Sequence, residues 1–544
     1  MSENSINLRK LESLVDKQSL IFLGIICLSG LVIRFYYFPF DIPITLDGLG
    51  YFWYAIEIKE QMGFPETLQF PNNGWSTFLS IFYIVIPSGN FLDYMTIQKV
   101  VSVSVSVITI PIIYFLSRRF FSKSLAMISA VFFCFDPRII LNSLLGSTET
   151  LYIFLGTLTL FLFLSKRYSL ICISFLIAGL MVLVRYEGVV ILIPLTIMFF
   201  VKFRKKDKVI LRYILLIGIF ILILLPMVYI RTQTIESIRL QEVDLIGEEK
   251  FEDYKGEKFS LISTGYDGII SHSIMSPTSF YGEVLKGEDG FNDLLHIFEK
   301  GIKNLIQYFT WITIPIFIIF LPLGFYLFIK NRNHDKITII IFLIVMCIPA
   351  FYAYSRGMQD TRYLLIMIPI LSIFAASTIQ KINEKINRPK ILGLIIIVFL
   401  LSTSGLFLYN KQIDRDYERD SYLMSIKISD VALGVNDYYP EARYLDVSQF
   451  YKYEFPIKKK LIEFVGSRTF SMENYESLEE FILYYEDKGL THIIFVNNET
   501  KLISLNDIES NAPFLKKEFE SRDFNYKPNI AVYKIDYKIF KEMI

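Results

Sequence analysis

Eleven apolar blocks of about twenty residues constrain the fold of this chain more than any other feature. A helix of that length crosses a bilayer hydrocarbon core of roughly 30 Å. The chain has 544 residues, is 53% hydrophobic and only 20% charged, which is untypical of soluble domains. The spans are expected at 19–40, 94–116, 125–142, 149–164, 169–184, 188–202, 209–230, 306–329, 337–354, 363–380 and 390–409. The sequence therefore predicts a polytopic α-helical membrane protein.

The short polar connections between these blocks alternate in charge, which predicts their topology. Every second connection is rich in Lys and Arg: SRRFFSK (117–123), SKR (165–167), KFRKKDK (202–208), KNRNHDK (330–336) and QKINEKINRPK (380–390). Basic connections favour the cytoplasmic side, so an odd number of spans leaves the N-terminus inside and the C-terminus outside. We expect a prokaryotic plasma membrane, with an ER-type membrane as the open alternative.

The chain divides into a transmembrane domain, 1–409, and a tail, 410–544. Two outer loops, about 41–93 and 231–305, interrupt the first domain. The tail contains strand-like runs at 442–447, 492–496 and 530–535, and a helical stretch at 476–489 with apolar Leu478, Phe481, Ile482 and Tyr485. Strands alternating with a helix predict a C-terminal extracytoplasmic α/β domain.

In the stretch LDGLGYFWYA (46–55), the carboxylate Asp47 stands just past the first span. Behind it, apolar side chains recur at helical spacing: Tyr51, Tyr54, Ala55, Ile58 and Met62. This pattern is typical of a short helix lying flat in the membrane interface. Such a helix would shelter Asp47 from bulk water. The alternative is that Asp47 only caps this helix.

Charged residues gather near the outer ends of the spans: Arg34, Lys99, Asp136, Arg138, Glu149, Arg185, Glu187, Arg356, Asp360 and Arg362. An ionised group at this depth is costly unless it is paired or lines a cavity. Arginine binds phosphate through two parallel hydrogen bonds and stays charged when partly buried. A ring of such residues at the outer membrane face therefore suits a lipid phosphate.

Each of these residues also has a purely structural interpretation. Glu149 follows Ser147 and Thr148 and lies in the first turn of a span, where the helix dipole alone favours an acid. Asp136-Pro137 can form a turn, with Arg138 as an interfacial anchor, and Arg185 can simply pair with Glu187. Their shared depth on one side favours a common site.

The order of motifs resembles the GT-C superfamily of membrane glycosyltransferases. The motifs are DGLGYFWYAIEI (47–58), NNGW (72–75), FDPRIILNSLLGSTETLYIFLGTLTL (135–160), LVRYEG (183–188) and TRYLLIMIPIL (361–371). The resemblance covers roughly 30–380. It is strongest to the branch that uses polyprenyl-phosphate sugars, which includes protein mannosyltransferases and aminoarabinose transferases.

The resemblance implies transfer of a sugar from a polyprenyl (dolichyl-type) phosphate, with inversion, to an acceptor on the outer face. That acceptor is a protein, a lipid or a glycan. Asp47 matches the family's catalytic carboxylate. The second acid matches Glu149, with Asp136 as a rival. Arg138, Arg185 and Arg362 are expected to hold the departing phosphate, with Lys99 as a further candidate. Asp136, Glu187 and Tyr363 are also expected to line the substrate and phosphate site.

The chain departs from the family pattern where many relatives have Asp-Glu, because Gly48 follows Asp47 here. No Asp-x-Asp occurs in the outer loops; the nearest, Asp414-Arg415-Asp416, follows the last span. The sequence therefore favours catalysis without a metal or other cofactor, and a divalent ion stays the alternative.

Two other classes of function compete with an enzyme. A transporter or flippase for the lipid-linked sugar would carry charges near the midplane and internal repeats. A receptor or scaffold that presents the tail would need far fewer spans. Neither explains charges that gather at one end of the spans.

Overall fold

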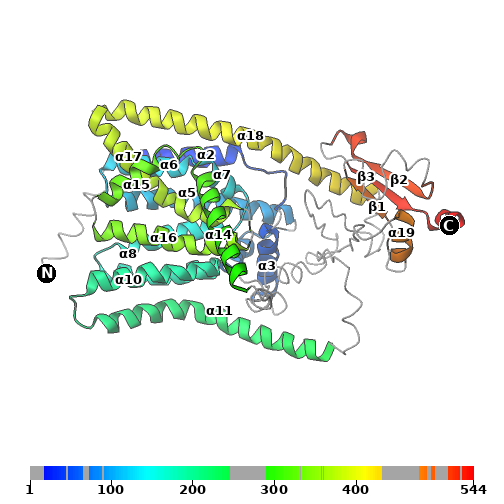
Figure 1. Cartoon of the computed structure of the whole chain (residues 1–544), viewed down its shortest axis with the longest axis horizontal. Helices are drawn as coiled ribbons and strands as arrows, with labels where there is room; N and C mark the ends of the chain where they lie inside the picture. Colours follow the sequence, from blue (N-terminus) through cyan, green and yellow to red (C-terminus); the bar gives the residue numbers. More distant parts are fainter. Residues whose placement is uncertain are drawn as a thin grey trace.

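The computed structural model describes residues 17–44, 47–64, 73–88, 91–245, 290–330, 333–356, 358, 360–386, 388–431, 477–486, 490, 492–496, 512–526 and 530–544. Long helices run side by side, and a small sheet lies at the C-terminal end (Figure 1). The helices up to residue 245 are α2 (Lys17–Tyr36), α3 (Asp47–Gln61), α4 (Gly74–Val85), α5 (Phe91–Ser117), α6 (Lys123–Cys134), α7 (Pro137–Leu144), α8 (Glu149–Phe163), α9 (Tyr168–Val184), η1 (Tyr186–Ile191), α10 (Leu192–Phe203) and α11 (Val209–Leu245).

The later helices are α14 (Gly290–Thr313), α15 (Leu321–Lys330), α16 (His334–Ser355), η2 (Thr361–Met367), α17 (Ile368–Ile386), α18 (Pro389–Val431), α19 (Leu478–Glu486), η4 (Ser521–Phe524) and α21 (Tyr537–Met543). The strands are β1 (His492–Val496), β2 (Leu515–Glu520) and β3 (Ile530–Ile535).

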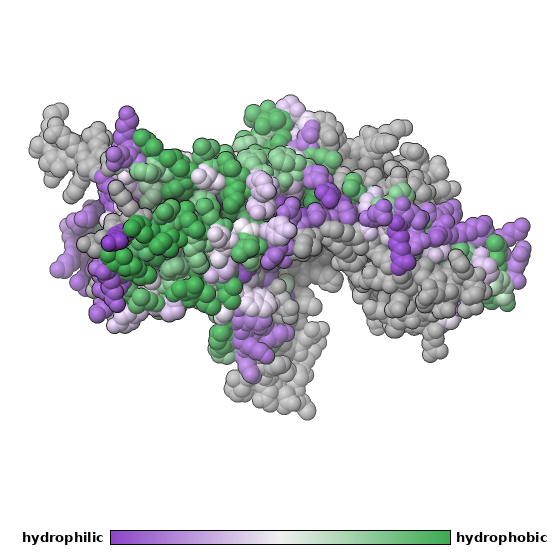
Figure 2. Space-filling model, turned by 90° about the horizontal axis from the view of Figure 1, so that it is seen from above, coloured by the Kyte–Doolittle hydropathy of each residue, from purple (hydrophilic) through white to green (hydrophobic). Residues whose placement is uncertain are grey.

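The helices of the body have the length and the apolar composition of membrane-spanning segments. Seven of the described helices are long and apolar enough to cross a membrane, or eight if the bent pair α6–α7 is one span. Apolar side chains, green in Figure 2, gather over the left and middle of the face seen there, with hydrophilic residues on either side. The chain is therefore an integral membrane protein. The count of eleven spans stays a prediction, since α8, α9 and α15 are shorter apolar helices. The predicted orientation of the termini also stays a prediction.

Prolines break two of the expected spans. The segment predicted at 125–142 is bent by 51° between α6 and α7, because the residue before Pro137 is driven out of the helical region. The segment predicted at 306–329 is not continuous, since α14 ends at Thr313 and α15 begins at Leu321. Pro315 lies in that gap and has no N–H to continue the helical hydrogen bonds.

The first outer loop contains the expected interfacial helix. α3 lies across the ends of the long helices rather than along them (Figure 1). Tyr51, Tyr54, Ala55 and Ile58 are buried as the spacing predicts. Met62 does not belong to the buried stripe, because the helix ends at Gln61 and Met62 is 73% exposed.

The expected outer loop at 231–305 is shorter than predicted. α11 continues to Leu245, and α14 already begins at Gly290. α14 places apolar side chains on one face and polar ones on the other. The mean hydropathy of its first half is therefore low, and this part of the helix was not recognised as one. Residues 246–289 lie outside the described part of the chain.

The tail begins as a continuation of the last span. α18 has 43 residues and is about 65 Å long at 1.5 Å per residue. It runs from the helical body to the sheet (Figure 1), and position 410 lies within it. In the sheet, β3 lies between β1 and β2 and pairs antiparallel with both.

Two of the expected tail strands are present as β1 and β3, and the expected helix as α19. Leu478, Phe481, Ile482 and Tyr485 form the buried face of α19 as predicted. The strand expected at 442–447 lies outside the described residues. The existence of a complete α/β domain over 410–544 therefore stays a prediction.

Close helix packing in the body generates a testable prediction at Gly324. A Cβ at this position would lie 2.1 Å from the carbonyl oxygen of Phe374 in α17, and backbone atoms cannot move aside easily. We expect Gly324→Ala to destabilise the protein by about 1–3 kcal/mol, measured as a lower thermal midpoint in detergent. Gly218→Ala in α11 is the control, because no atom lies within 4 Å of its Cβ position. Equal midpoints for the two variants would contradict this packing.

Candidate active site

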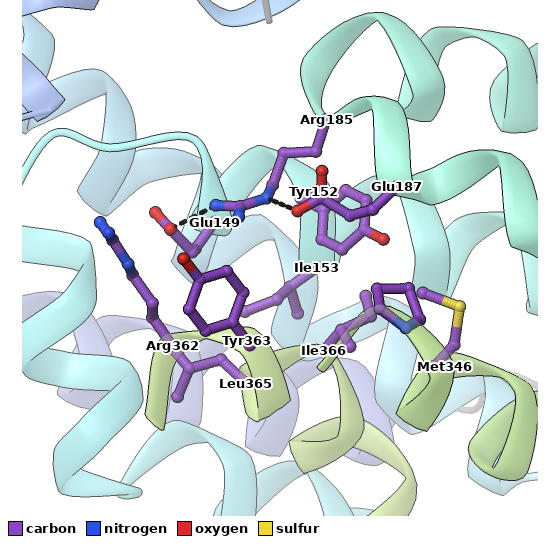
Figure 3. Close-up of a pocket in the computed structure, with 11 residues that line it drawn as sticks. Glu149, Tyr152, Ile153, Arg185, Glu187, Met346, Arg362, Tyr363, Leu365 and Ile366 are labelled. Atoms are coloured by element: carbon purple, nitrogen blue, oxygen red, sulfur yellow. Dashed lines mark hydrogen bonds and ion pairs between the residues drawn. The ribbon is translucent and has the colours of Figure 1, made fainter. Parts of the chain in front are cut away.

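Arg185 forms the centre of a buried ion-pair cluster at one end of the helices (Figure 3). Its extended backbone joins α9 to η1. Nη1 donates to Glu149 Oε1 at 2.5 Å, and Nε donates to Glu187 Oε1 at 2.5 Å. Nη1 also reaches Thr148 Oγ1 at 3.2 Å. The pairing predicted for Arg185 and Glu187 is present, and Glu149 joins it as a second carboxylate.

Two aromatic rings and a second arginine surround this cluster. The Arg185 guanidinium lies 5.9 Å from the ring centre of Tyr152 and 5.8 Å from that of Tyr363, which favours the cation. Arg362 lies on the side of Glu149 away from Arg185 (Figure 3). Glu149 therefore lies between two guanidinium groups.

The short helix η2 presents Arg362 and Tyr363 to the cluster. Asp360 begins η2 by accepting a hydrogen bond from the Arg362 backbone N–H at 2.8 Å. The Asp360 side chain also pairs with the Arg362 guanidinium, with Nε and Oδ2 3.0 Å apart. The same carboxylate thus caps the N-terminus of η2 and orients the Arg362 side chain.

Two cavities adjoin this cluster and share Glu149, Arg362 and Leu365 as walls. The inner cavity is narrow, and its polar lining comes from the Arg185 cluster and the tyrosines described above. The outer cavity is wider, with a volume of about 290 Å³. Its lining residues are Gly48, Arg138, Leu141, Asn142, Leu145, Ser147, Glu149, Asp360, Thr361, Arg362, Leu365, Phe407 and Lys411.

Arg138 projects into the outer cavity from the first turn of α7. Its Nη2 donates to the carbonyl oxygens of Trp311 and Ile314 at 2.5 and 3.1 Å. The guanidinium also lies 5.4 Å from the ring centre of Phe407. Backbone carbonyls orient Arg138 without neutralising its charge, so it remains a cation that an anionic ligand can pair with.

Asp47 is the first residue of α3, and its side chain lies outside the described part of the chain. The next residue, Gly48, lines the outer cavity. A Cβ at Gly48 would lie 2.5 Å from Ile44 Cγ2 and 3.2 Å from the carbonyl oxygen of Leu145. The backbone beside the candidate catalytic acid is therefore packed tightly against the loop that leads to Glu149.

Two other predicted site residues lie away from both cavities. Lys99 is buried in α5, and its ammonium donates to the carbonyl oxygens of Pro39 and Ile42. Asp136 is the N-cap of α7 and accepts from the backbone N–H groups of Arg138 and Ile139 at 3.0 Å each. In the structure, Lys99 binds the backbone of the segment that follows α2, and Asp136 caps the N-terminus of α7.

Several polar residues of these cavities were not among the predicted site residues, and three of them are Lys411, Asn142 and Tyr152. Lys411 reaches the outer cavity from α18. Asn142 lines the outer cavity with a buried Nδ2 that has no hydrogen-bond partner among the described residues. The same holds for the Tyr152 hydroxyl in the inner cavity. The helical spacing of Arg138 and Asn142 could have indicated that they share a face of α7.

Within the described residues, no three His, Cys, Asp or Glu side chains lie close enough together to hold a metal ion. The residues that line the two cavities offer arginine, lysine, amide and hydroxyl groups to a ligand. The carboxylates of Glu149, Glu187 and Asp360 are paired with arginines. Such a set suits an anion carried by an apolar molecule.

The fold and the site define an integral membrane protein with a cavity lined by arginines and a lysine at one end of its helices. Residues 94–230 match the family described as Dolichyl-phosphate-mannose-protein mannosyltransferase. This segment contains Arg138, Glu149 and Arg185. This match over part of the chain agrees with the resemblance to GT-C membrane glycosyltransferases. None of the curated proteins compared matches the chain.

Solved GT-C structures are also similar to this chain. The apo oligosaccharyltransferase of Archaeoglobus fulgidus is 13% identical with a TM-score of 0.47, over 88% of this chain and 69% of that one. The same enzyme, AglB, with an inhibitory peptide and a dolichol-phosphate gives 14% and 0.46 over the same shares. ArnT from Cupriavidus metallidurans bound to undecaprenyl phosphate gives 12% and 0.40, over 66% of this chain and 60% of that one.

The ion-pair cluster predicts a large cost for removing its central cation. Arg185 and Glu149 have side chains only 12% and 4% exposed, so Arg185→Leu removes the guanidinium that pairs with both Glu149 and Glu187 in a buried site. We expect a loss of about 3–5 kcal/mol in the free energy of unfolding, measured by chemical denaturation in detergent.

The control is Lys381→Leu, which removes a pair with Glu384 whose side chains are about half exposed. Its expected cost is below about 1 kcal/mol. A similar cost for both variants would mean that water reaches the Arg185 cluster and that burial does not govern it.

Proposed function

We propose that this protein is a glycosyltransferase that moves a sugar from a polyprenyl phosphate to an acceptor on the outer membrane face. The observation that carries the proposal is the outer cavity, where Arg138, Arg362 and Lys411 meet the N-terminal end of α3. The family match over 94–230 supports a dolichyl-type phosphate sugar as donor. The acceptor class, a protein, a lipid or a glycan, belongs to the same proposal.

The charges of the outer cavity suit a phosphate. Its walls carry three cations and two carboxylates, but Glu149 pairs with Arg185 and Asp360 pairs with Arg362. A phosphate that enters adds negative charge that Arg138 can bind. Arg138 is already held in one orientation by two carbonyl groups, so little side-chain entropy is lost when it binds.

The apolar walls of the outer cavity suit the carrier's hydrocarbon. Leu141 and Leu145, from α7 and its end, face the same cavity as Phe407 of α18. Leu145 is 59% exposed, so this wall offers a route from the surrounding lipid. In this arrangement the first isoprenyl unit contacts these side chains while the phosphate contacts Arg138.

The reaction that fits this site is a single displacement. Asp47, as general base, takes the proton of the acceptor hydroxyl, and that oxygen attacks C1 of the sugar. The bond between C1 and the phosphate oxygen breaks, and the carrier phosphate leaves with one more negative charge. Arg138, Arg362 and Lys411 stabilise that charge as it develops. Attack opposite to the leaving group inverts the configuration at C1.

Glu149 and Glu187 have a different role from Asp47 in this proposal. Both carboxylates bind Arg185, so they hold the arginine and the cavity wall in place. Glu149 is the second acid of the proposed site, at the boundary of the two cavities. The inner cavity, with the Tyr152 and Tyr363 rings, can contact the transferred sugar.

The general-base role predicts that Asp47→Asn binds the carrier but transfers no sugar. The purified variant is incubated with a radiolabelled polyprenyl-phosphate hexose and cell-envelope material. Transfer should fall by about 100-fold or more, while the Kd for the carrier changes little. Asp41→Asn, an exposed acid of the same loop, is the control. If Asp47→Asn transfers sugar at the rate of Asp41→Asn, Asp47 only caps α3.

The proposed phosphate site in the outer cavity predicts that Arg138→Gln binds the carrier more weakly. Losing charge-assisted hydrogen bonds to a phosphate should raise the Kd for undecaprenyl phosphate by about tenfold or more. Microscale thermophoresis in detergent measures this constant. Arg356→Gln, at an arginine that lines neither cavity, should stay within about twofold of the wild-type value. Equal affinities for all three proteins would place the carrier phosphate elsewhere.

A further inference from the structure

A buried amide joins the two backbone segments that carry the candidate acids. Gln98, in α5, is fully buried. Its Nε2 donates to the carbonyl oxygen of Gly48 at 3.0 Å and to that of Gly146 at 2.7 Å. Gly48 follows Asp47 directly, and Gly146 precedes Glu149 by three residues. One nitrogen atom therefore bridges the start of α3 and the turn before α8.

The hydrogen-bond network fixes the orientation of this amide. Gln98 Oε1 accepts from the hydroxyl of Tyr83 at 3.0 Å. Rotating the amide by 180° would place Oε1 against two carbonyl oxygens, which repel it. Both N–H groups and the oxygen are thus used, and a leucine of similar size could form none of these bonds.

A second donor acts on the same turn from α4. Trp75 Nε1 donates to the carbonyl oxygen of Gly146 at 2.9 Å. Gly146 has a φ of +68°, a conformation that favours glycine, so this turn is shaped to present its carbonyl to both donors. Trp75 is also fully buried.

α4 also contacts the segment before Arg185. A Cβ at Gly74 would lie 2.6 Å from the carbonyl carbon of Leu183 and 2.7 Å from the nitrogen of Val184. Glycine at this position lets α4 approach that backbone closely. The NNGW motif thus brings one donor to the Gly146 turn and packs against the end of α9.

We propose that Gln98 is a positioning residue that fixes the separation of Asp47 and Glu149 across the outer cavity, with Trp75 as its partner on Gly146. The inference rests on the proposed function. Neither residue lines either cavity, so neither touches the donor. Both act through the backbone of the segments that carry the acids. The effect expected is on the rate of transfer rather than on binding of the carrier.

The test compares Gln98→Leu with wild type in two independent measurements. The first measures kcat for sugar transfer and the Kd for undecaprenyl phosphate. A misplacement of reacting groups by about 1 Å costs about 100-fold in rate, so kcat should fall by about that factor while Kd stays within about threefold. The second measures hydrogen–deuterium exchange of peptides covering 47–52 and 145–150, which should become faster.

The control is Tyr168→Phe, which removes a hydrogen bond from the Tyr168 hydroxyl to the Arg212 carbonyl oxygen. Tyr168 begins α9, at the opposite end of that helix from Arg185. Its kcat and its exchange at 47–52 and 145–150 should equal those of wild type. Unchanged exchange in Gln98→Leu overturns the proposal, and so does an unchanged kcat in an active enzyme.

The two measurements separate this inference from the proposed function. If wild-type protein transfers no sugar but Gln98→Leu still exchanges faster in both segments, the proposed function fails and the bridge remains. If Gln98→Leu does not fold, Trp75→Phe takes its place, because it removes one donor to Gly146 and leaves the Gln98 bridge. It should lower kcat by about tenfold and speed exchange at 145–150 only. Wild-type values in both measurements for this variant would overturn the proposal.

Discussion

The site depends on one physical constraint, which is that an arginine buried at the end of a helix bundle must be paired. Arg185 meets this constraint with Glu149 from α8 and Glu187 from η1. Glu149 lies 36 residues before Arg185, so this ion pair holds the start of α8 to the end of α9, whereas Glu187 lies only two residues beyond Arg185. Arg362 then lies next to Glu149 on the other side (Figure 3). The wall between the two cavities follows from these pairings.

Much of the fold could be predicted because its signals are local. Apolar blocks gave the helices, and helical spacing gave the buried face of α3 and the four buried positions of α19. The break at Pro315 was missed because apolar composition continues through it. At Pro137 the expected span continued as well, but the alternative of a turn at Asp136-Pro137 is the one that the structure contains. The length of α11 and the start of α14 were missed because a polar or amphipathic helix does not raise the average hydropathy.

The site was harder to predict, because depth in the membrane does not determine what a charged side chain contacts. Arg138, Glu149, Arg362 and the segment of Asp47 meet at the outer cavity. Lys99 lies at a similar depth but binds carbonyl groups. Lys411 was missed since it follows the last predicted span, where α18 simply continues. These outcomes depend on the path of the backbone, which no pattern of residue types reveals.

The tight packing at Gly48 leaves no space for a side chain directly after Asp47. Any side chain at position 48 would meet Ile44 and the carbonyl oxygen of Leu145. That carbonyl belongs to the turn held by Gln98 and Trp75 through Gly146. The close approach that leaves no room for a side chain at position 48 is therefore the same contact that brings the start of α3 to the turn before α8. Glu149, on the far side of that turn, is one of the carboxylates that line the outer cavity.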